Sequence, residues 1–333
     1  MGLRRELLGG QATPFQAALA MALRGLLRFG VRPAFRPGMR LGVQRFWLNT
    51  ASRASLVAGG VPRHRARFGS VPAEILGRPQ GPVLLYLHGG GYVSGSPATR
   101  RSLTSHLARR LNATVVVPAY RLAPEHPCPA ALDDALMVYQ RLLDKGHDAS
   151  HIAVGGDAAG GGLTLALLQR IRDSALPAPA AGVLLSPWLD LTVNQEQRSD
   201  IGETLLNVPW LAQAARLYAG DDLARPQASP LYGDLNGLPP LLIQSGGDEL
   251  LRVDSERLAD RLRATDTPSR YQLFPRRWHV FQTHAGLLAD ADLAVAEIGD
   301  FLHQKWEKAV NNEQLTGNSE GKWGGCGCAS VLC

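Results

Sequence analysis

The sequence predicts an α/β fold in which a mostly parallel sheet is flanked by helices. Apolar segments of strand length alternate with amphipathic segments of helix length from about residue 82 to residue 304, as they do in consecutive βαβ units. Hydrophobic residues make up 45% of the 333 residues, which is ample material for a core. A glycine-rich turn at Gly156 to Gly160 joins one of the expected strands to one of the expected helices.

The elements are expected in the following order. Residues 1 to about 60 look mostly helical and suit a cap, and from His64 the pattern turns to strands (RHRARFGSV, then AEILG). Further strands are expected at 82–89, 113–120, 152–156, 181–188, 239–247 and 269–275, with helices near 97–111, 129–144, 159–174, 253–264 and 289–304.

The predicted domain organisation has three parts. A cap segment covers residues 1–60, and the α/β domain covers 61–304 with a second cap element inserted at about 190–237. Residues 305–333 hold three of the four lysines and three of the four cysteines, a shift in composition that predicts a disordered tail. Cys326-x-Cys328 in this tail is a weak metal signal, and no cofactor or metal is expected.

The net charge of +6 is unevenly distributed. Residues 1–70 contain twelve arginines and one acidic residue, Glu6, so the remainder of the chain is net negative. No basic helix with stacking aromatics is present, which argues against nucleic acid as a partner and favours a charged surface, with anionic lipid as one candidate neighbour. The sequence does not define an oligomeric state.

No apolar run reaches the roughly 18 residues that a membrane span needs. Arg24 interrupts the apolar segment FQAALAMALRGLL, and no convincing cleavage site follows it, which favours an amphipathic helix over a signal peptide. Glu6 stands where a myristoylation signal requires Ser or Thr. With a single cysteine, Cys128, outside the tail, no disulfide framework is expected, and the cytoplasm is the expected location.

The turn Gly156-Asp157-Ala158-Ala159-Gly160 has the frame of a nucleophile elbow, G-x-S-x-G, on a strand–turn–helix. In such an elbow small neighbours let the backbone carry a nucleophile through strained angles. Here the central residue is Ala158, which has no oxygen to attack with. The turn is therefore either unrelated to hydrolysis or an elbow whose nucleophile has been removed.

A second motif, His88-Gly89-Gly90-Gly91-Tyr92, follows a buried apolar strand. Glycines there bring backbone N–H groups close to a tetrahedral oxyanion, and each such donor typically contributes about 2.7 to 4 kcal/mol. A third motif, YRLAPEHP from residue 120, is interpreted as a rigid loop held by structural ion pairs of Arg121, Glu125 and Asp133 or Asp134.

Together these motifs resemble the hormone-sensitive-lipase-like α/β-hydrolases, the bacterial family IV esterases. The resemblance covers residues 64 to 304 and rests on HGGGY, YRLAPEHP, GDAAGG where the family has GDSAGG, SPWLDLT, GLPPLLIQSGGDELL and WHVFQ, in family order. It implies an α/β-hydrolase fold with a helical cap and a serine esterase mechanism.

The resemblance also implies roles for individual residues. Ala158 occupies the nucleophile position, Asp248 the acid position and His279 the base position, with Glu249 and Asp254 as rival acids and His284 as a rival base. The oxyanion hole is expected from Gly89, Gly90, Gly91 and Ala159, and substrate contacts from His88, Tyr92, Asp157, Trp188 and Trp210.

With a serine at position 158, His279 would accept its proton and the acid would fix the histidine tautomer. In the serine protease subtilisin, loss of the nucleophile lowers kcat by a factor on the order of 10⁶. Natural decay would erode the other parts as well, so their retention favours a deliberate Ser→Ala change. A non-catalytic binding protein, as in the plant gibberellin receptors, is the alternative from another class.

The substrate is expected to be an uncharged ester with a short to medium acyl group. Five apolar side chains of the expected cap favour such ligands, namely Phe46, Trp47, Trp210, Leu211 and Tyr218. Ring opening of a lactone, including a macrolide antibiotic, is a second possibility, because the change in composition near Glu307 suits a mobile gene cassette.

Overall fold

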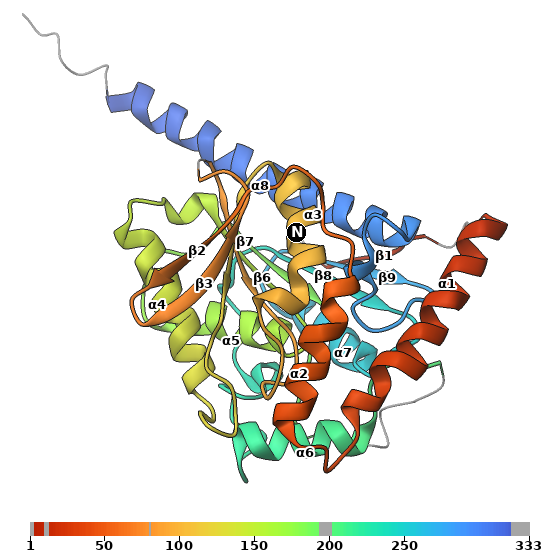
Figure 1. Cartoon of the computed structure of the whole chain (residues 1–333). Coiled ribbons are helices and arrows are strands. Elements are labelled where there is room, and N and C mark those ends of the chain that lie inside the picture. Colours follow the sequence, from red (N-terminus) through yellow and green to blue (C-terminus); the bar gives the residue numbers. More distant parts are fainter. Residues whose placement is uncertain (1–2, 10–12, 80, 193–201, 321–333) are drawn as a thin grey trace, which may run out of the picture.

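The computed structural model describes residues 3–9, 13–79, 81–192 and 202–320 (Figure 1). Within these ranges nine strands form one sheet in the order β1-β9-β8-β7-β6-β4-β5-β3-β2. Neighbouring strands are parallel, except that β3 runs antiparallel to both β2 and β5. The strands are β1 (Arg4–Leu7), β2 (Arg63–Phe68), β3 (Val71–Leu76), β4 (Val83–Leu87), β5 (Thr114–Pro118), β6 (Ile152–Asp157), β7 (Ala181–Leu185), β8 (Leu241–Gly246) and β9 (Ser269–Phe274).

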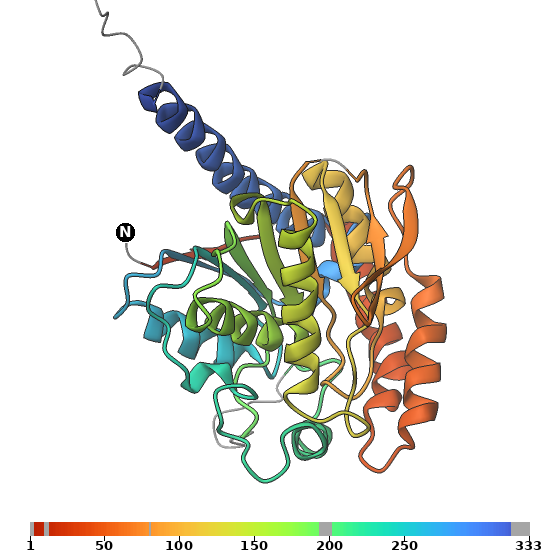
Figure 2. The same ribbon diagram turned by 90° about the vertical axis from the view of Figure 1, so that its left-hand side faces the viewer.

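Helices cover both faces of this sheet (Figures 1 and 2). The side chains of α4, α5 and α7 share one hydrophobic cluster with the strands, and those of α3 and α8 share a second. The predicted class, a mostly parallel sheet flanked by helices, is confirmed. The helices are α1 (Pro14–Leu26), α2 (Leu41–Ala51), α3 (Arg101–Leu111), α4 (Ala130–Asp144), α5 (Ala159–Asp173), α6 (Val208–Ala219), α7 (Arg252–Leu262) and α8 (Ala289–Glu320).

The interior strand β4 shows why the sheet needs helices on both faces. All five of its residues are buried, and they alternate between the two clusters. Val83, Leu85 and Leu87 belong to the cluster with α4 and α5, whereas Leu84 and Tyr86 belong to the cluster with α3 and α8. Successive side chains of a strand point to opposite faces, so a continuous apolar run is stable only when both faces are covered.

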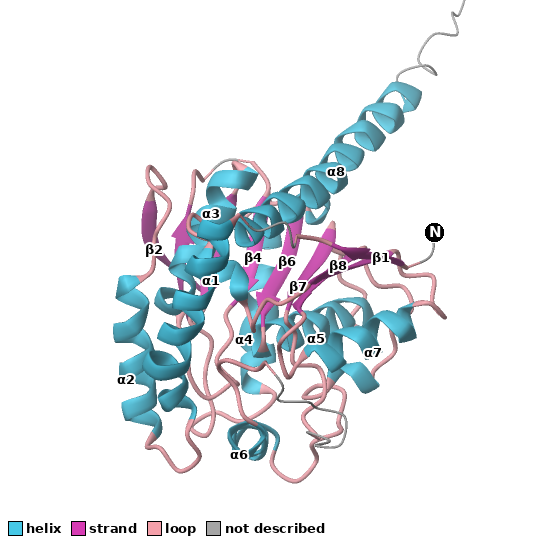
Figure 3. Ribbon diagram, turned by 90° about the vertical axis from the view of Figure 1, so that its right-hand side faces the viewer, coloured by secondary structure: helices cyan, strands magenta, loops and turns pink. Residues whose placement is uncertain are grey.

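The cap is built from two separate parts of the chain. The N-terminal part comprises α1, a π-helical turn at Leu27–Val31 and α2, and the inserted part contributes α6. In Figure 3, α6 lies beyond one end of the sheet and α2 stands beside the sheet. Residues 193–201 of the expected insertion lie outside the described residues.

Residues 1–60 are mostly helical in the described ranges, as predicted, but they also contain one strand. Residues Arg4–Leu7 form β1, which pairs in parallel with β9. Glu6 lies within 2.8 Å of Arg4 and 3.5 Å of Arg270 on β9, and the Leu8 N–H donates to the carbonyl of Leu273. The segment RREL has no apolar periodicity from which a strand could be predicted. It forms a strand because it pairs with the backbone of β9, whose otherwise unpaired edge it covers.

The closing helix is longer than predicted. Helix α8 runs without a break from Ala289 to Glu320, past residue 304 where the tail was expected to begin. The remainder of the expected tail, residues 321–333, lies outside the described residues. No helix in the part of the chain that the structure describes is both long and apolar enough to cross a membrane.

The loop YRLAPEHP forms ion pairs of the predicted kind. Arg121 lies 2.8 Å from Asp134, which is the partner among the two acidic residues considered. Glu125 pairs with Arg45 of α2 at 2.7 Å, and this bond ties the loop to the cap. Hydrogen bonding from the Arg45 guanidinium lowers the pKa of Glu125 to about 2.

Candidate active site

The turn between β6 and α5 has the backbone of a nucleophile elbow. Ala158 lies at φ 51° and ψ −120°, a conformation that a non-glycine residue adopts at a cost of about 1 to 3 kcal/mol. Its N–H donates to the carbonyl of Leu185 at 2.9 Å, and its own carbonyl accepts from Trp188 at 2.9 Å. A Cβ on Gly160 would collide with the carbonyl oxygen of Leu87, so the close approach of the turn to β4 requires glycine there.

The glycine loop after β4 offers two free backbone donors. Gly90 (φ 136°) and Gly91 (φ 64°) lie in conformations that favour glycine, and neither N–H has a hydrogen-bond acceptor in the described structure. Both residues line a cavity together with Ala158 and Ala159. A Cβ on Gly91 would collide with the Trp210 ring, which packs against the loop from α6.

Gly89 does not fit the role expected for it in the oxyanion hole. Its N–H donates to the Asp157 carboxylate at 3.1 Å and is therefore not available to a substrate. The same carboxylate accepts from Tyr86 at 3.0 Å and from Arg100 at 2.6 Å. Asp157 is fully buried, and its hydrogen bond from Gly89 anchors the glycine loop to the protein interior.

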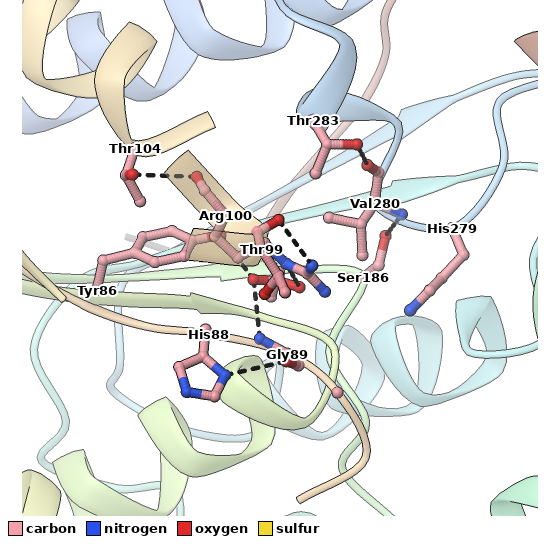
Figure 4. Close-up of polar contacts among 12 residues, drawn as sticks. Tyr86, His88, Gly89, Thr99, Arg100, Thr104, Ser186, His279, Val280 and Thr283 are labelled. Carbon is pink, nitrogen blue, oxygen red and sulfur yellow. Dashed lines mark hydrogen bonds and ion pairs between the residues drawn. The ribbon is translucent and has the colours of Figure 1, made fainter. Parts of the chain in front are cut away.

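Three residues expected to contact substrate, His88, Tyr92 and Asp157, are absent from the lining of the cavity. His88 stacks on Tyr120 at 4.2 Å, and its Nδ1 lies 3.0 Å from the Gly89 carbonyl oxygen (Figure 4). Burial lowers the pKa of His88 to about 4, so the imidazole is neutral at pH 7. Tyr92 stacks on Tyr218 of α6 at 3.8 Å. These side chains support the loop, whereas Trp188 and Trp210, also expected to contact substrate, line the cavity.

His279 is paired with Glu249. Its Nδ1 lies 3.0 Å from Glu249 Oε2, and both side chains are buried. Glu249 also accepts from the N–H of Gly246 at the end of β8. Burial raises the pKa of the Glu249 carboxyl, and the hydrogen bond from His279 opposes that rise.

The loop that carries His279 is held in place by its next residue. Val280 has a positive φ of 51°, and its N–H donates to Ser186 Oγ at 3.1 Å (Figure 4). His279 lines the same cavity as Ala158, Gly90 and Gly91. The rival His284 also lines the cavity, but its Nδ1 lies near the hydroxyl of Thr283 and the carbonyl of Phe281, and no carboxylate of the described residues pairs with it.

Asp248, the predicted acid, does not contact His279. Its carboxylate pairs with Arg24 of α1 at 2.5 Å, and its N–H donates to the carbonyl of Arg277. The side chain of Glu249 instead folds back toward the end of β8. Asp254, the other rival, accepts the N–H groups of Leu189 and Asp190. The predicted partner of His279 was therefore wrong by one residue: it is Glu249, not Asp248. Nothing in the sequence distinguishes these two adjacent carboxylates.

The cavity that these residues share has a volume of about 280 Å³ and a mainly apolar lining. Two of the five apolar cap residues singled out in the sequence line it, Trp210 and Leu211. Phe46 and Trp47 are instead exposed on the outside of α2. Among the described residues no group of three or more His, Cys, Asp or Glu side chains is placed to hold a metal ion.

A strained strand–turn–helix and a His–Glu pair that line one cavity at the carboxyl ends of parallel strands define an α/β-hydrolase. A family model described as the alpha/beta hydrolase fold matches residues 84–283. The putative acetyl-hydrolase LipR of Mycobacterium tuberculosis is 37% identical over 85% of this chain and 94% of its own length. An acetyl-hydrolase of Streptomyces hygroscopicus is 41% identical over 68% of this chain and 76% of its own length.

Solved structures agree with these relatives. A crystal structure of an esterase from the bacterial hormone-sensitive lipase family superimposes with a TM-score of 0.81 and 37% identity, over 89% of this chain and all of that one. A hormone-sensitive lipase from a metagenome library gives a TM-score of 0.81 and 35% identity, over 86% of this chain and 98% of its own. The chain therefore belongs to the hormone-sensitive-lipase-like family of α/β-hydrolases, a family of carboxylic ester hydrolases.

Proposed function

We propose that this chain is the inactive form of a serine carboxylesterase for uncharged esters, with alanine in place of the nucleophile. The observation that carries the proposal is the backbone of Ala158, which keeps the strained angles of an elbow beside a paired His279. Such strain is retained where a surrounding structure holds it for function. The intact His279 and Glu249 support a single deliberate Ser→Ala change over gradual decay.

The mechanism follows from these positions. A serine at 158 would attack the ester carbonyl and give its proton to Nε2 of His279, while Glu249 holds the Nδ1–H and stabilises the imidazolium. The N–H groups of Gly90, Gly91 and Ala159 would bind the oxyanion. His279 would then return the proton to the leaving alcohol and activate a water that releases the acyl group. With Ala158 the first bond cannot form.

The cavity supports esters of modest size. Its volume of about 280 Å³ lies just below the roughly 300 to 1,000 Å³ of pockets for drug-sized ligands. Its apolar lining favours uncharged groups. The volume gives no support to a macrocyclic lactone, and incubation of an Ala158→Ser variant with a macrolide panel, read by mass, tests that alternative.

The proposal is tested by introducing the nucleophile. Ala158→Ser should hydrolyse p-nitrophenyl acetate and butyrate at least about 10³-fold faster than the present chain, since a triad nucleophile is worth up to about 10⁶ in kcat. Ala158→Gly, which removes strain but supplies no hydroxyl, is the matched control and should stay inactive.

The two possible results separate the enzyme from a binding protein. A serine variant that folds, as shown by an unchanged circular dichroism spectrum, yet does not exceed the Ala158→Gly rate would refute the esterase proposal. In that case the ligand-binding alternative would remain, with the apolar cavity as its site.

The buried free thiol of Cys128 is in keeping with the cytoplasm as the proposed location.

A further inference from the structure

The outer surface of the N-terminal cap exposes large apolar side chains. We call this surface the cap face and define it by Leu26, Phe29, Val43, Phe46, Trp47, Leu56 and Val57. Phe29 and Phe46 are 79% and 72% exposed. Both helices of the N-terminal cap lie at the outside of the molecule, side by side, in Figures 1 and 2.

Several of these side chains lie close together although they come from separate elements. The Trp47 Nε1–H donates to the carbonyl of Gly30 at 3.0 Å, which joins α2 to the turn that carries Phe29. Val43 and Trp47 are one helical turn apart on α2, with Phe46 beside them. Leu26 and Leu56 both line the cavity as well, so they connect the cap face to the active site.

The same N-terminal segment also carries exposed positive charge. Arg28, Arg36, Arg40 and Arg53 are exposed, and their side chains have no hydrogen-bond or ion-pair partner among the described residues. No acidic residue occurs between Glu6 and Glu74. Arg24 and Arg45 of the same segment are, by contrast, paired with carboxylates from the body of the protein.

We propose that the cap face docks on the surface of an anionic lipid bilayer. Exposed aromatic and aliphatic side chains among unpaired arginines are the combination that binds an interface, because the apolar groups enter the acyl boundary while the arginines meet lipid phosphates. A second copy of the chain is a poorer occupant, because a two-fold contact through this face would bring two sets of four unpaired arginines together.

The docked orientation would bring the entrance of the cavity to the lipid. Leu26 and Leu56 are 64% and 48% exposed and also line the cavity, so an ester leaving the bilayer would meet apolar side chains where the cap face joins the cavity. This consequence rests on the proposed esterase function, whereas docking itself does not. Binding can therefore be measured on the chain as it stands, with Ala158.

The test is co-sedimentation with vesicles of phosphatidylcholine alone and of equal parts phosphatidylcholine and phosphatidylglycerol. The chain should bind the anionic vesicles at least about tenfold more tightly than the neutral vesicles. Salt at about 0.5 M should weaken the binding to the anionic vesicles. Phe29→Ser/Phe46→Ser and Arg28→Gln/Arg53→Gln should each weaken binding about tenfold. Leu293→Ser, on α8, is the matched control and should bind as the parent does.

Three results would overturn the proposal. The first is absence of binding to anionic vesicles, and the second is binding that the two double variants leave unchanged while their melting temperatures match the parent. The third is a dimer in light scattering that Phe29→Ser/Phe46→Ser converts to monomer, which would assign the face to a second copy. None of these results bears on whether Ala158→Ser hydrolyses esters.

Discussion

Residue 158 keeps the backbone of a catalytic turn although its side chain has no chemistry. The strain at Ala158 is held by backbone hydrogen bonds, to Leu185 and from Trp188 and Gly162, and by glycines that let α5 approach β4. None of these contacts involves the missing hydroxyl. The elbow is therefore a property of the surrounding fold, and a serine placed there inherits the geometry without rearrangement.

At the same scale the two adjacent carboxylates should have separable effects in an Ala158→Ser background. Glu249→Gln should lower kcat by on the order of 10³ to 10⁴, because the histidine loses the acceptor that fixes its tautomer. Asp248→Asn, the neighbouring control, should change kcat less than about tenfold, because its carboxylate binds Arg24 instead. Steady-state kinetics decide between them, and a larger loss in Asp248→Asn would restore the assignment from sequence.

The site is readable from sequence where spacing alone defines it. The glycine frame, Ala158 and His279 follow directly after predicted strands, so their place at one sheet edge could be inferred. The choice of Glu249 over Asp248 could not, since it depends on how the turn after β8 directs two consecutive side chains. The use of the Gly89 N–H by Asp157 was equally hidden, because it depends on a contact across 68 positions of sequence.

Among the elements, α1 is the one that ties the cap to the catalytic loops. Arg24 donates to Asp248 after β8 and to the carbonyl of Arg276 after β9, at 2.5 and 2.7 Å. It also donates to the carbonyl of Gly202 in the inserted part, and its guanidinium lies 5.4 Å from the Trp278 ring centre. One side chain thus joins four segments that meet at the cavity.

Arg24→Ala, in the Ala158→Ser background, should raise KM for butyrate esters about tenfold, the equivalent of about 1.4 kcal/mol of binding. It should leave kcat within about threefold, because the His279–Glu249 pair makes no contact with Arg24. Hydrogen exchange of α1 should accelerate. Arg28→Ala, one turn further along and unpaired, is the control with a soluble ester. An unchanged KM in Arg24→Ala would show that the cap holds without it.

Secondary structure was predictable where packing and periodicity agree. The helices and strands between residues 82 and 304 follow their apolar patterns, because each buries its apolar side against the sheet. β1 could not be predicted in this way, since RREL is stabilised by the backbone of β9, some 260 positions away. The exposed positions of Phe46 and Trp47 could not be predicted either, because an apolar residue in a cap helix fits the inside and the outside equally well.

Over the whole molecule, two of the hydrophobic clusters meet at the sheet, and its interior strand β4 is followed directly by a buried, neutral histidine. His88 is 1% exposed, and burial holds its pKa at about 4 against 6.5 in an unfolded chain. Between these values the unfolded chain binds a proton that the folded chain does not. The stabilisation is complete above pH 6.5 and is lost as the pH falls toward 4.

We therefore expect acid to destabilise the entire fold through His88. From pH 7 to pH 5 this group should remove about 2 kcal/mol from the free energy of unfolding. His88→Asn keeps a donor for the Gly89 carbonyl but cannot ionise, so its free energy of unfolding should fall less over that interval, whatever its value at pH 7. Urea unfolding at both pH values measures the difference, with His64→Asn, at an exposed position on β2, as the control. Equal pH dependence in His88→Asn and the parent would mean that the histidine gains its proton without loss of the fold.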